Sequence, residues 1–387
     1  MLTNKNFGDI VTFTRASARW RFSNGGVLVQ DAANVPSMDY DPATLAARGM
    51  LIEEARTNAF RNNSMAGAVA GAPGTLPTYW SDENRGTLSR TVVAIGTEYG
   101  MPYMDLRLNG TTSTVYTNIQ FDATVIAAAQ GQTWVASMYC KLVGGSLANV
   151  SAFNLTIGEF TSAAAYLTDA GSGFIPANGL QRATAVRALS NASTAYAKPW
   201  IAINYASGVA IDFTLRIYAP QFEQSAFPSS PILTTTAQVT RAADNAIITD
   251  LSKIGFNASE GTLYAEATLS ASGSNRVLTF SDGTTTNQIW ISASGCQIYA
   301  GGATQANWPQ ALAVGTHKVA LAYKAGDAAL SIDGAAAVGQ APAAIPPLSR
   351  LIIGQNTGSA AYLNGWLRNV RYIPRRMTNA ELQNLTA

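Results

Sequence analysis

Short runs of alternating apolar and polar residues, found along the whole chain of 387 residues, constrain the fold more than any other feature. In the clearest run, Ile211, Phe213, Leu215 and Ile217 alternate with polar or charged residues. A period of two residues puts the apolar side chains on one face of a strand, which fits an antiparallel sheet with one buried and one solvated face. Long helical periodicity is absent from the sequence, so we predict an all-β fold.

Turn residues separate these runs at intervals of roughly ten to fifteen residues, a spacing typical of sandwiches and jelly rolls rather than of βαβ folds. The chain is also longer than one hydrophobic core usually organises. We therefore expect two tandem antiparallel β-sandwich or jelly-roll domains, over residues 61–240 and 241–387, after an N-terminal element over residues 1–60.

The two ends of the chain carry local signals of their own. Asn24, Gly25 and Gly26 predict the turn of a short β-hairpin in the N-terminal element, because these residues tolerate positive φ. Near the C-terminus, Thr378 and Glu381 have the spacing of a capping box and predict a short helix.

Composition and charge exclude several classes of partner. Charged residues make up 12% of the chain and the net charge is +2, without any run of Lys or Arg, so we expect neither nucleic-acid binding nor attraction to an anionic membrane. No apolar stretch reaches the length of about 18 residues that a spanning helix needs, so membrane insertion is not expected. Residues 1–5 lack the apolar core of a signal peptide, which predicts synthesis in a cytoplasm. Cys140 and Cys296 lie far apart and are expected to stay reduced.

Several segments together resemble tail and other structural proteins of tailed bacteriophages and prophages. The segments at the N-terminus are Thr-Arg-Ala at residues 14–16, Tyr-Asp-Pro at 40–42 and Arg-Gly-Met-Leu-Ile-Glu-Glu-Ala-Arg-Thr-Asn at 48–58, which in that family precede a carbohydrate-binding-module-like sandwich. Residues 354–356 and 364–372 resemble the closing strands of laminin-G-like, concanavalin-A-like jelly rolls. The resemblance implies a virion protein of the tail tip, fibre or baseplate that contacts the host surface and forms a homo-oligomer, with a trimer favoured.

The sequence shows no motif that is typical of a catalytic, nucleotide-binding or metal-binding site. It has a single histidine, His317, and two remote cysteines, which do not form a metal site or a nucleophile pair by spacing. No strand carries the alternating acids of concanavalin-A-like hydrolases, and no phosphate-binding glycine motif follows a strand. Glu53 and Glu54 are interpreted as a structural brace with Arg56. We therefore expect that the chain is not an enzyme and has no cofactor, with a glycan depolymerase as the minor alternative, since scattered carboxylates can converge in space.

The sequence does not decide whether loop carboxylates bind calcium. Asp282, Asp327 and Asp333 lie in loops where carboxylates of jelly rolls bind this ion. Asp282 and Asp333 are each followed by glycine, so both also suit a hairpin turn. The turn interpretation is favoured.

Exposed aromatic residues are the candidates for ligand binding, because a sugar ring stacks on an aromatic face while amides read its hydroxyls. Trp308 is the best single candidate, since it lies in a polar loop, although it could also plug one end of the sandwich. Trp366 is assigned to the core. The other candidates are Trp290, Tyr299, Asn356 and Tyr362 in the C-terminal domain, and Trp80 and Tyr103 in the middle domain.

The predicted function is therefore binding to the bacterial host surface by a virion protein, with a surface glycan as ligand. The alternative is an architectural subunit whose sandwiches contact other virion tail proteins.

Overall fold

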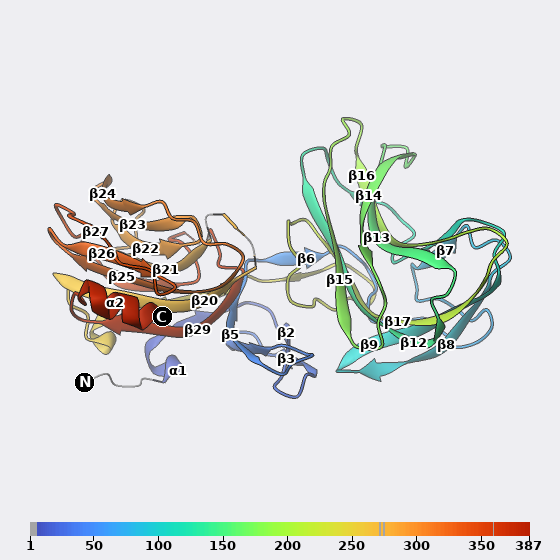
Figure 1. Ribbon diagram of the computed structural model, residues 1–387, viewed down its shortest axis with the longest axis horizontal. Coiled ribbons are helices and arrows are strands. Elements are labelled where there is room, and N and C mark those ends of the chain that lie inside the picture. Colours follow the sequence, from blue (N-terminus) through green and yellow to red (C-terminus); the bar gives the residue numbers. More distant parts are fainter. Residues whose placement is uncertain (1–5, 271, 274, 359) are drawn as a thin grey trace. The chain divides into compact units, whose positions relative to one another are not determined.

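The computed structural model describes residues 6–270, 272, 273, 275–358 and 360–387. The described chain forms two compact units. The terminal unit consists of Gln30–Ala55, Ala242–Ala387 and the described residues up to Asn24, and the middle unit consists of Gly25–Val29 and Arg56–Arg241. Both units are built from antiparallel strands, so the all-β prediction is confirmed (Figure 1). The proposed division into three consecutive segments at residues 60 and 240 remains a prediction.

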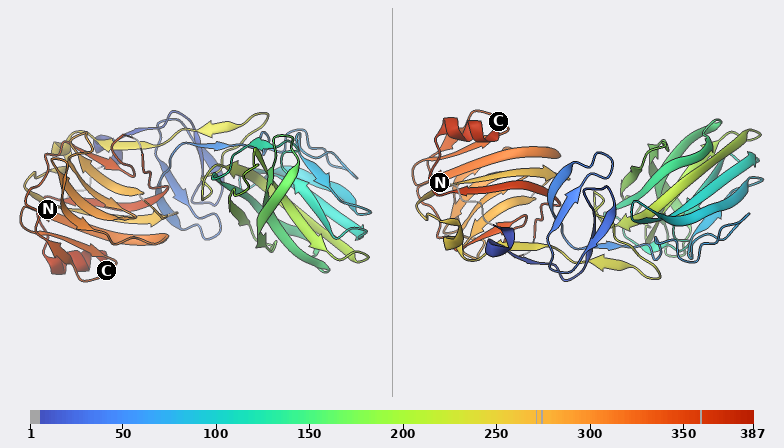
Figure 2. Two further views of the ribbon diagram at one scale, coloured as in Figure 1. Left: turned by 90° about the horizontal axis from the view of Figure 1, so that it is seen from above. Right: turned by 90° about the horizontal axis from the view of Figure 1, so that it is seen from below.

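The terminal unit contains two sheets of seven strands each, which Figure 2 shows from two further sides. The first sheet has the order β1 (Thr12–Thr14), β19 (Asn245–Ile248), β28 (Arg350–Ile353), β21 (Arg276–Ser281), β22 (Gln288–Ser292), β23 (Gly295–Ala300) and β24 (Ala303–Trp308). The second has the order β27 (Val338–Gln340), β26 (Ala328–Ile332), β25 (Gly315–Lys324), β20 (Glu260–Leu269), β29 (Gly365–Ile373), β5 (Ala47–Ile52) and β4 (Ser37–Tyr40).

Three short helices belong to the terminal unit: α1 (Phe7–Ile10), the 3-10 helix η1 (Leu251–Ile254) and α2 (Asn379–Thr386). The capping box that the sequence predicts for the last helix is present, since the Thr378 side chain accepts from the backbone of Glu381 and the Glu381 side chain accepts from the backbone of Thr378. Leu382 of α2 is fully buried against β25 and β26. The helix is therefore fixed both by its cap and by one apolar side chain.

Strand alternation explains the core of the terminal unit. Ile289, Ile291 and Ile298 of the first sheet and Leu263 and Leu321 of the second are completely buried in one apolar cluster. The cluster also includes Met50 and Ile52 of β5, which pairs with β29 through Ile52 and Gly365. β4 and β5, expected in a separate N-terminal element, thus extend a sheet whose other five strands come from residues 260–373.

The middle unit also contains two main sheets. The larger has the order β14 (Tyr166–Phe174), β13 (Val150–Phe160), β16 (Tyr196–Tyr205), β10 (Tyr116–Gln120) and β7 (Ser81–Glu83), with β11 (Ile126–Ala127) paired to β16. The smaller has the order β15 (Gln181–Ala188), β12 (Thr133–Ser146), β17 (Ala210–Glu223), β9 (Met101–Thr111) and β8 (Ser89–Glu98). A further pair in this unit is β6 (Arg56–Asn58) with β18 (Val239–Arg241). The predicted hairpin is formed by β2 (Arg19–Phe22), whose residues belong to the terminal unit, and β3 (Leu28–Asp31).

The run that predicted the fold most clearly lies at the centre of the smaller sheet of the middle unit. Ile211, Phe213, Leu215 and Ile217 of β17 are all buried in the core of this unit. The opposite side chains of the same strand include Arg216, which lies on the other face and pairs with Asp105 of β9. The alternation in the sequence therefore separates the core face from a polar face, as predicted.

A buried ion cluster in the terminal unit joins two of the segments that carry the phage resemblance. Arg15 Nη1 lies 3.2 Å from Asp244 Oδ1, and Arg19 donates to the other oxygen of the same carboxylate. Arg19 Nη2 also lies 3.3 Å from Glu53 Oε2, and the Glu53 backbone N–H donates to Asp244 Oδ2 at 2.7 Å. Glu53 therefore pairs with Arg19, which the sequence did not single out, and the predicted brace by Glu53 and Glu54 with Arg56 remains a prediction.

Among the described residues, no helix is long and apolar enough to cross a membrane. Residues 1–5, from which the absence of a signal peptide was predicted, lie outside the described part of the chain.

Candidate functional site

The first sheet of the terminal unit carries two of the predicted binding residues, Trp290 and Tyr299, on its outward face. Because Ile289, Ile291 and Ile298 point into the core, alternation turns Trp290 on β22 and Tyr299 on β23 outward. Their ring centres lie 6.2 Å apart with the planes at 52°. Both rings are partly exposed, so the face offers aromatic surface to a ligand.

Arg276, the first residue of β21, extends this pair. Its guanidinium carbon lies 4.0 Å from the centre of the Trp290 ring, a cation–π contact. Trp290 thus contacts both Arg276 and Tyr299. We call these three residues the aromatic strip.

Side-chain amides lie next to the aromatic strip, with Gln297 partly exposed and Gln288 buried. Gln288 pairs with Tyr299 across the strands and Gln297 pairs with Trp290. Gln288 Nε2 donates to Asn356 Oδ1 at 3.3 Å and to Thr357 Oγ1 at 2.9 Å, which ties the loop after β28 to this face. Asn356 is partly exposed. Aromatic rings next to amides and hydroxyls are the groups that recognise a sugar ring and its hydroxyls.

The structure therefore brings together three of the residues predicted in the C-terminal domain: Trp290, Tyr299 and Asn356. Trp308 and Tyr362 are not, because both side chains belong to the apolar core, with exposed fractions of 3% and 7%. The loop expected around Trp308 is strand β24, and its indole N–H donates to the carbonyl of Val338 at 2.8 Å. A ring buried in this way does not present a face to a sugar, which makes Trp308 the plug that the sequence left as its alternative.

The prediction for Trp366 is corrected in the opposite sense, from buried to partly exposed. It was assigned to the core, but Leu367 takes the inward position on β29 and Trp366 is only partly buried. Its indole N–H donates to Asp39 Oδ2 at 2.9 Å, and the guanidinium of Arg48 lies 4.9 Å from its ring centre. Trp366 therefore links β29 to the strands from the N-terminal segment.

The two candidates of the middle unit do not share a surface. Trp80 is 7% exposed, packs edge-on against Phe121 at 4.9 Å and donates to the carbonyl of Asn62. Tyr103 on β9 points away from this core, because its neighbour Met104 is the inward residue. Trp80 is thus a core residue, whereas Tyr103 lies on the outer face of the smaller sheet.

That outer face carries a dense network of charges around Tyr103. The Arg216 guanidinium lies 3.7 Å from the Tyr103 ring centre and pairs with Asp105 and with Glu98. Burial acts to raise the pKa of Glu98, but hydrogen bonds from Lys141, Tyr218 and Arg216 outweigh it and lower the pKa to about 2. The charges of this face are therefore matched among themselves.

The loop carboxylates considered for calcium serve as turn and pairing groups. Asp282 accepts from Thr284 and Asn287 within its own loop, and Asp333 accepts from the Lys318 backbone and contacts His317 Nδ1 at 2.6 Å. Asp327 pairs with Arg376 at 2.8 Å. Within the described ranges, no group of three or more His, Cys, Asp or Glu side chains could hold a metal ion.

The two cysteines are free and buried. Burial raises the pKa of the Cys140 thiol to about 11 and that of the Cys296 thiol to about 12. Neither thiol is ionised at neutral pH, so neither is an activated nucleophile.

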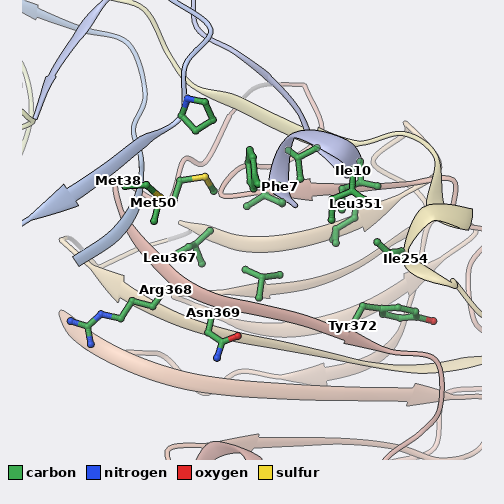
Figure 3. A pocket seen from close by; sticks show the side chains of 15 residues that line it. Phe7, Ile10, Met38, Met50, Ile254, Leu351, Leu367, Arg368, Asn369 and Tyr372 are labelled. Carbon is green, nitrogen blue, oxygen red and sulfur yellow. The ribbon is translucent and has the colours of Figure 1, made fainter. Parts of the chain in front are cut away.

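A cavity of about 480 Å³ in the terminal unit is lined almost entirely by apolar side chains (Figure 3). Phe7 and Ile10 of α1 and Met50 of β5 contribute to its walls, with Leu367 and Tyr372 of β29. Its polar lining consists of Arg368, which pairs with Glu266, and Asn369, which accepts from Arg371. The cavity contains none of the predicted site residues and no carboxylate.

No family model and no curated protein matches this sequence. Solved structures with a similar fold include three that bear on the sequence resemblance. The tripod from the baseplate of bacteriophage Tuc2009 covers 89% of this chain and 100% of its own, with 11% identity and a TM-score of 0.32. Domains LG4-5 of the mouse laminin α1 chain cover 75% of this chain and 94% of their own, with 11% identity and a TM-score of 0.26.

The third is the enzymatically active domain of tailspike protein 4 of bacteriophage CBA120, with 10% identity and a TM-score of 0.24. This match covers 38% of the present chain but only 19% of the tailspike chain. Phage baseplate and tailspike proteins and laminin G domains are thus among the structural neighbours, with a CBM22 tandem from Paenibacillus barcinonensis Xyn10C. These are the classes of protein that the sequence resemblance named, and at these identities the likeness concerns the fold alone.

The prediction that the chain is not an enzyme is corrected by the same comparison. Besides the tailspike domain, the similar structures include an α-L-arabinofuranosidase at 12% identity and TM-score 0.32, and Trypanosoma rangeli sialidase at 10% and 0.30. The prediction relied on the lack of alternating acids along one strand. Carboxylates from different strands can meet, as Glu98 of β8 and Asp105 of β9 do on Arg216, so the lack of a linear motif does not exclude an enzyme.

Sequence reasoning missed Arg276, Gln288 and Gln297. Each is an ordinary polar residue in a short strand, and only the register of β21, β22 and β23 brings them next to Trp290 and Tyr299. A sequence signal does exist in retrospect, since β21 to β24 and β28 contain two arginines and no acidic residue.

Proposed function

We propose that this chain is a tail protein of a bacteriophage that binds a glycan on the surface of the bacterial host through the aromatic strip. The observation that carries the proposal is the position of Trp290 and Tyr299 on one outward sheet face, next to the partly exposed amides of Gln297 and Asn356. Rigid aromatic rings on a sheet, flanked by amides, suit a sugar because the rings cover its apolar face and the amides bond its hydroxyls.

The proposal includes the partners and location that the sequence resemblance implies. The chain would be made in the host cytoplasm and incorporated into the virion, where it contacts other tail proteins and forms a homo-oligomer, with a trimer favoured. A surface with few charged residues supports such contacts, because burying it between subunits desolvates few charges.

Adsorption of the purified full-length protein to a panel of bacterial strains tests the proposal. We expect Trp290→Ala and Tyr299→Ala to weaken adsorption at least about tenfold, since central aromatic residues dominate such interfaces. Tyr166→Ala is the matched control, because Tyr166 is 58% exposed on β14 of the middle unit. Thermal melts confirm that each variant is folded.

Two outcomes would reject the proposed site. Adsorption that survives both substitutions on the aromatic strip would show that another surface binds the host. Protein that adsorbs to none of the strains but copurifies with other tail proteins would favour the architectural alternative.

A further inference from the structure

We propose that the aromatic strip selects an anionic saccharide, a sugar that carries a carboxylate or a phosphate, and that Arg276 supplies the cation that recognises it. This inference rests on the proposed glycan-binding function. It adds the chemical class of the ligand.

The first observation concerns the groups that contact the Arg276 side chain. Its guanidinium stacks on Trp290, and its Nε is buried without a hydrogen-bond partner among the described residues. In the described part of the chain, no carboxylate forms an ion pair or a hydrogen bond with this side chain. Burial lowers the pKa of Arg276 to about 10, which still leaves the group charged at neutral pH.

Three arginines that are more deeply buried than Arg276 are paired with carboxylates. Arg15 and Arg19 share the carboxylate of Asp244, and Arg187 binds Glu159 through Nε and Nη2. Arg276 is only partly buried, so its charge, which no carboxylate of the described residues neutralises, is available to an anion from outside the chain.

The surroundings of Arg276 favour an anion over a neutral sugar. The strands that form this face, β21 to β24 and β28, contain no Asp or Glu. Asp282, in the loop after β21, accepts hydrogen bonds from Thr284 and Asn287 within that loop. The planar guanidinium donates in a fork that matches the two oxygens of a carboxylate or a phosphate. Next to it, Trp290 and Tyr299 supply the surface for the ring of the same sugar.

A second arginine extends the argument to a polymer. Arg350 of β28 pairs with Ser281 at the far end of β21, and its Nε is also buried without a partner among the described residues. Arg276 and Ser281 are five residues apart on one strand, which places the two cations on the order of 16 Å apart. Two cations at this spacing suit a chain of sugars with repeated negative charges.

The test uses the full-length protein and a panel of bacterial polysaccharides. Each polysaccharide is presented in its native form, after reduction of its carboxyl groups to alcohols, and after removal of its phosphates with hydrofluoric acid. We expect at least one native polysaccharide to bind, and one of the two treatments to weaken its binding tenfold or more. The treatment that does so identifies carboxylate or phosphate as the anion.

Variants assign the effect to the residue. Arg276→Gln should weaken binding of the native polysaccharide about tenfold or more, because a hydrogen bond to a charged group is lost, while Arg276→Lys should retain part of it. Arg107→Gln is the control, since it removes the same charge from an exposed ion pair with Asp212 in the middle unit.

Failure of this inference and failure of the proposed function give different results. If the treated and native forms bind equally and Arg276→Gln binds like the wild type, while Trp290→Ala abolishes binding, the strip binds a neutral glycan and only the anionic class is wrong. If no polysaccharide in any form binds, the proposed function itself is rejected.

Discussion

Asp244 is expected to be the most sensitive single carboxylate of the terminal unit. Its side chain is fully buried, and it holds two arginines whose side chains are also fully buried, Arg15 and Arg19. Asp244→Asn keeps the shape of the side chain but removes the charge, so two guanidinium groups are left in the interior, of which Arg19 retains an ion pair with Glu53.

The expected magnitude follows from this burial. Removing one partner of a buried ion pair destabilises a protein by about 3 to 5 kcal/mol, which in a unit of this size lowers the melting temperature by about 6 to 20 °C. Differential scanning calorimetry of the wild type and of Asp244→Asn measures the shift.

Asp212→Asn provides the matched control for this prediction. Asp212 also pairs with an arginine, at 2.7 Å, but both side chains are about half exposed, 43% for Arg107 and 52% for Asp212. An exposed pair contributes at most about 1 kcal/mol, so this variant should melt close to the wild type. If Asp244→Asn shifts the melting temperature no more than Asp212→Asn does, the buried cluster does not stabilise the fold as argued.

Two further predictions concern pH and backbone geometry. Burial acts to raise the pKa of Glu159, but hydrogen bonds from Thr194, Arg187 and two backbone N–H groups lower it to about 2, so its stabilising contribution is complete above its ordinary pKa of 4.5 and is lost as the pH falls toward 2. The difference in unfolding free energy between the wild type and Glu159→Gln, measured by urea titration, should therefore shrink across that window; a constant difference would contradict the assignment. Gly49→Ala should destabilise the terminal unit by more than about 1 kcal/mol, because φ is +109° and an added Cβ would lie 2.4 Å from the Leu367 carbonyl oxygen. Gly8→Ala, where a Cβ meets nothing within 4 Å, should melt like the wild type in the same calorimetric scan.

Patterns among neighbouring residues were enough to predict individual strands and the C-terminal helix. The alternation at residues 211–217 predicted a strand with one buried face, and the spacing of Thr378 and Glu381 predicted a capped helix, because both signals depend only on neighbours along the chain. The same reasoning could not decide whether a single tryptophan faces in or out. Trp308 was expected at the surface and Trp366 in the core, and the structure places Trp308 in the core and Trp366 in contact with Asp39.

The sequence by itself determined that this chain builds antiparallel sheets, because the period of two residues fixes which side chains share a face. Only the tertiary structure decided which strands became neighbours, since hydrogen-bonded pairing joins residues that are far apart in the chain. It placed Arg276 over Trp290, brought Asn356 to Gln288, and joined Arg15 and Arg19 to Asp244 across more than 200 positions. The candidate site and the buried ion cluster both arise from such pairings, which no local pattern encodes.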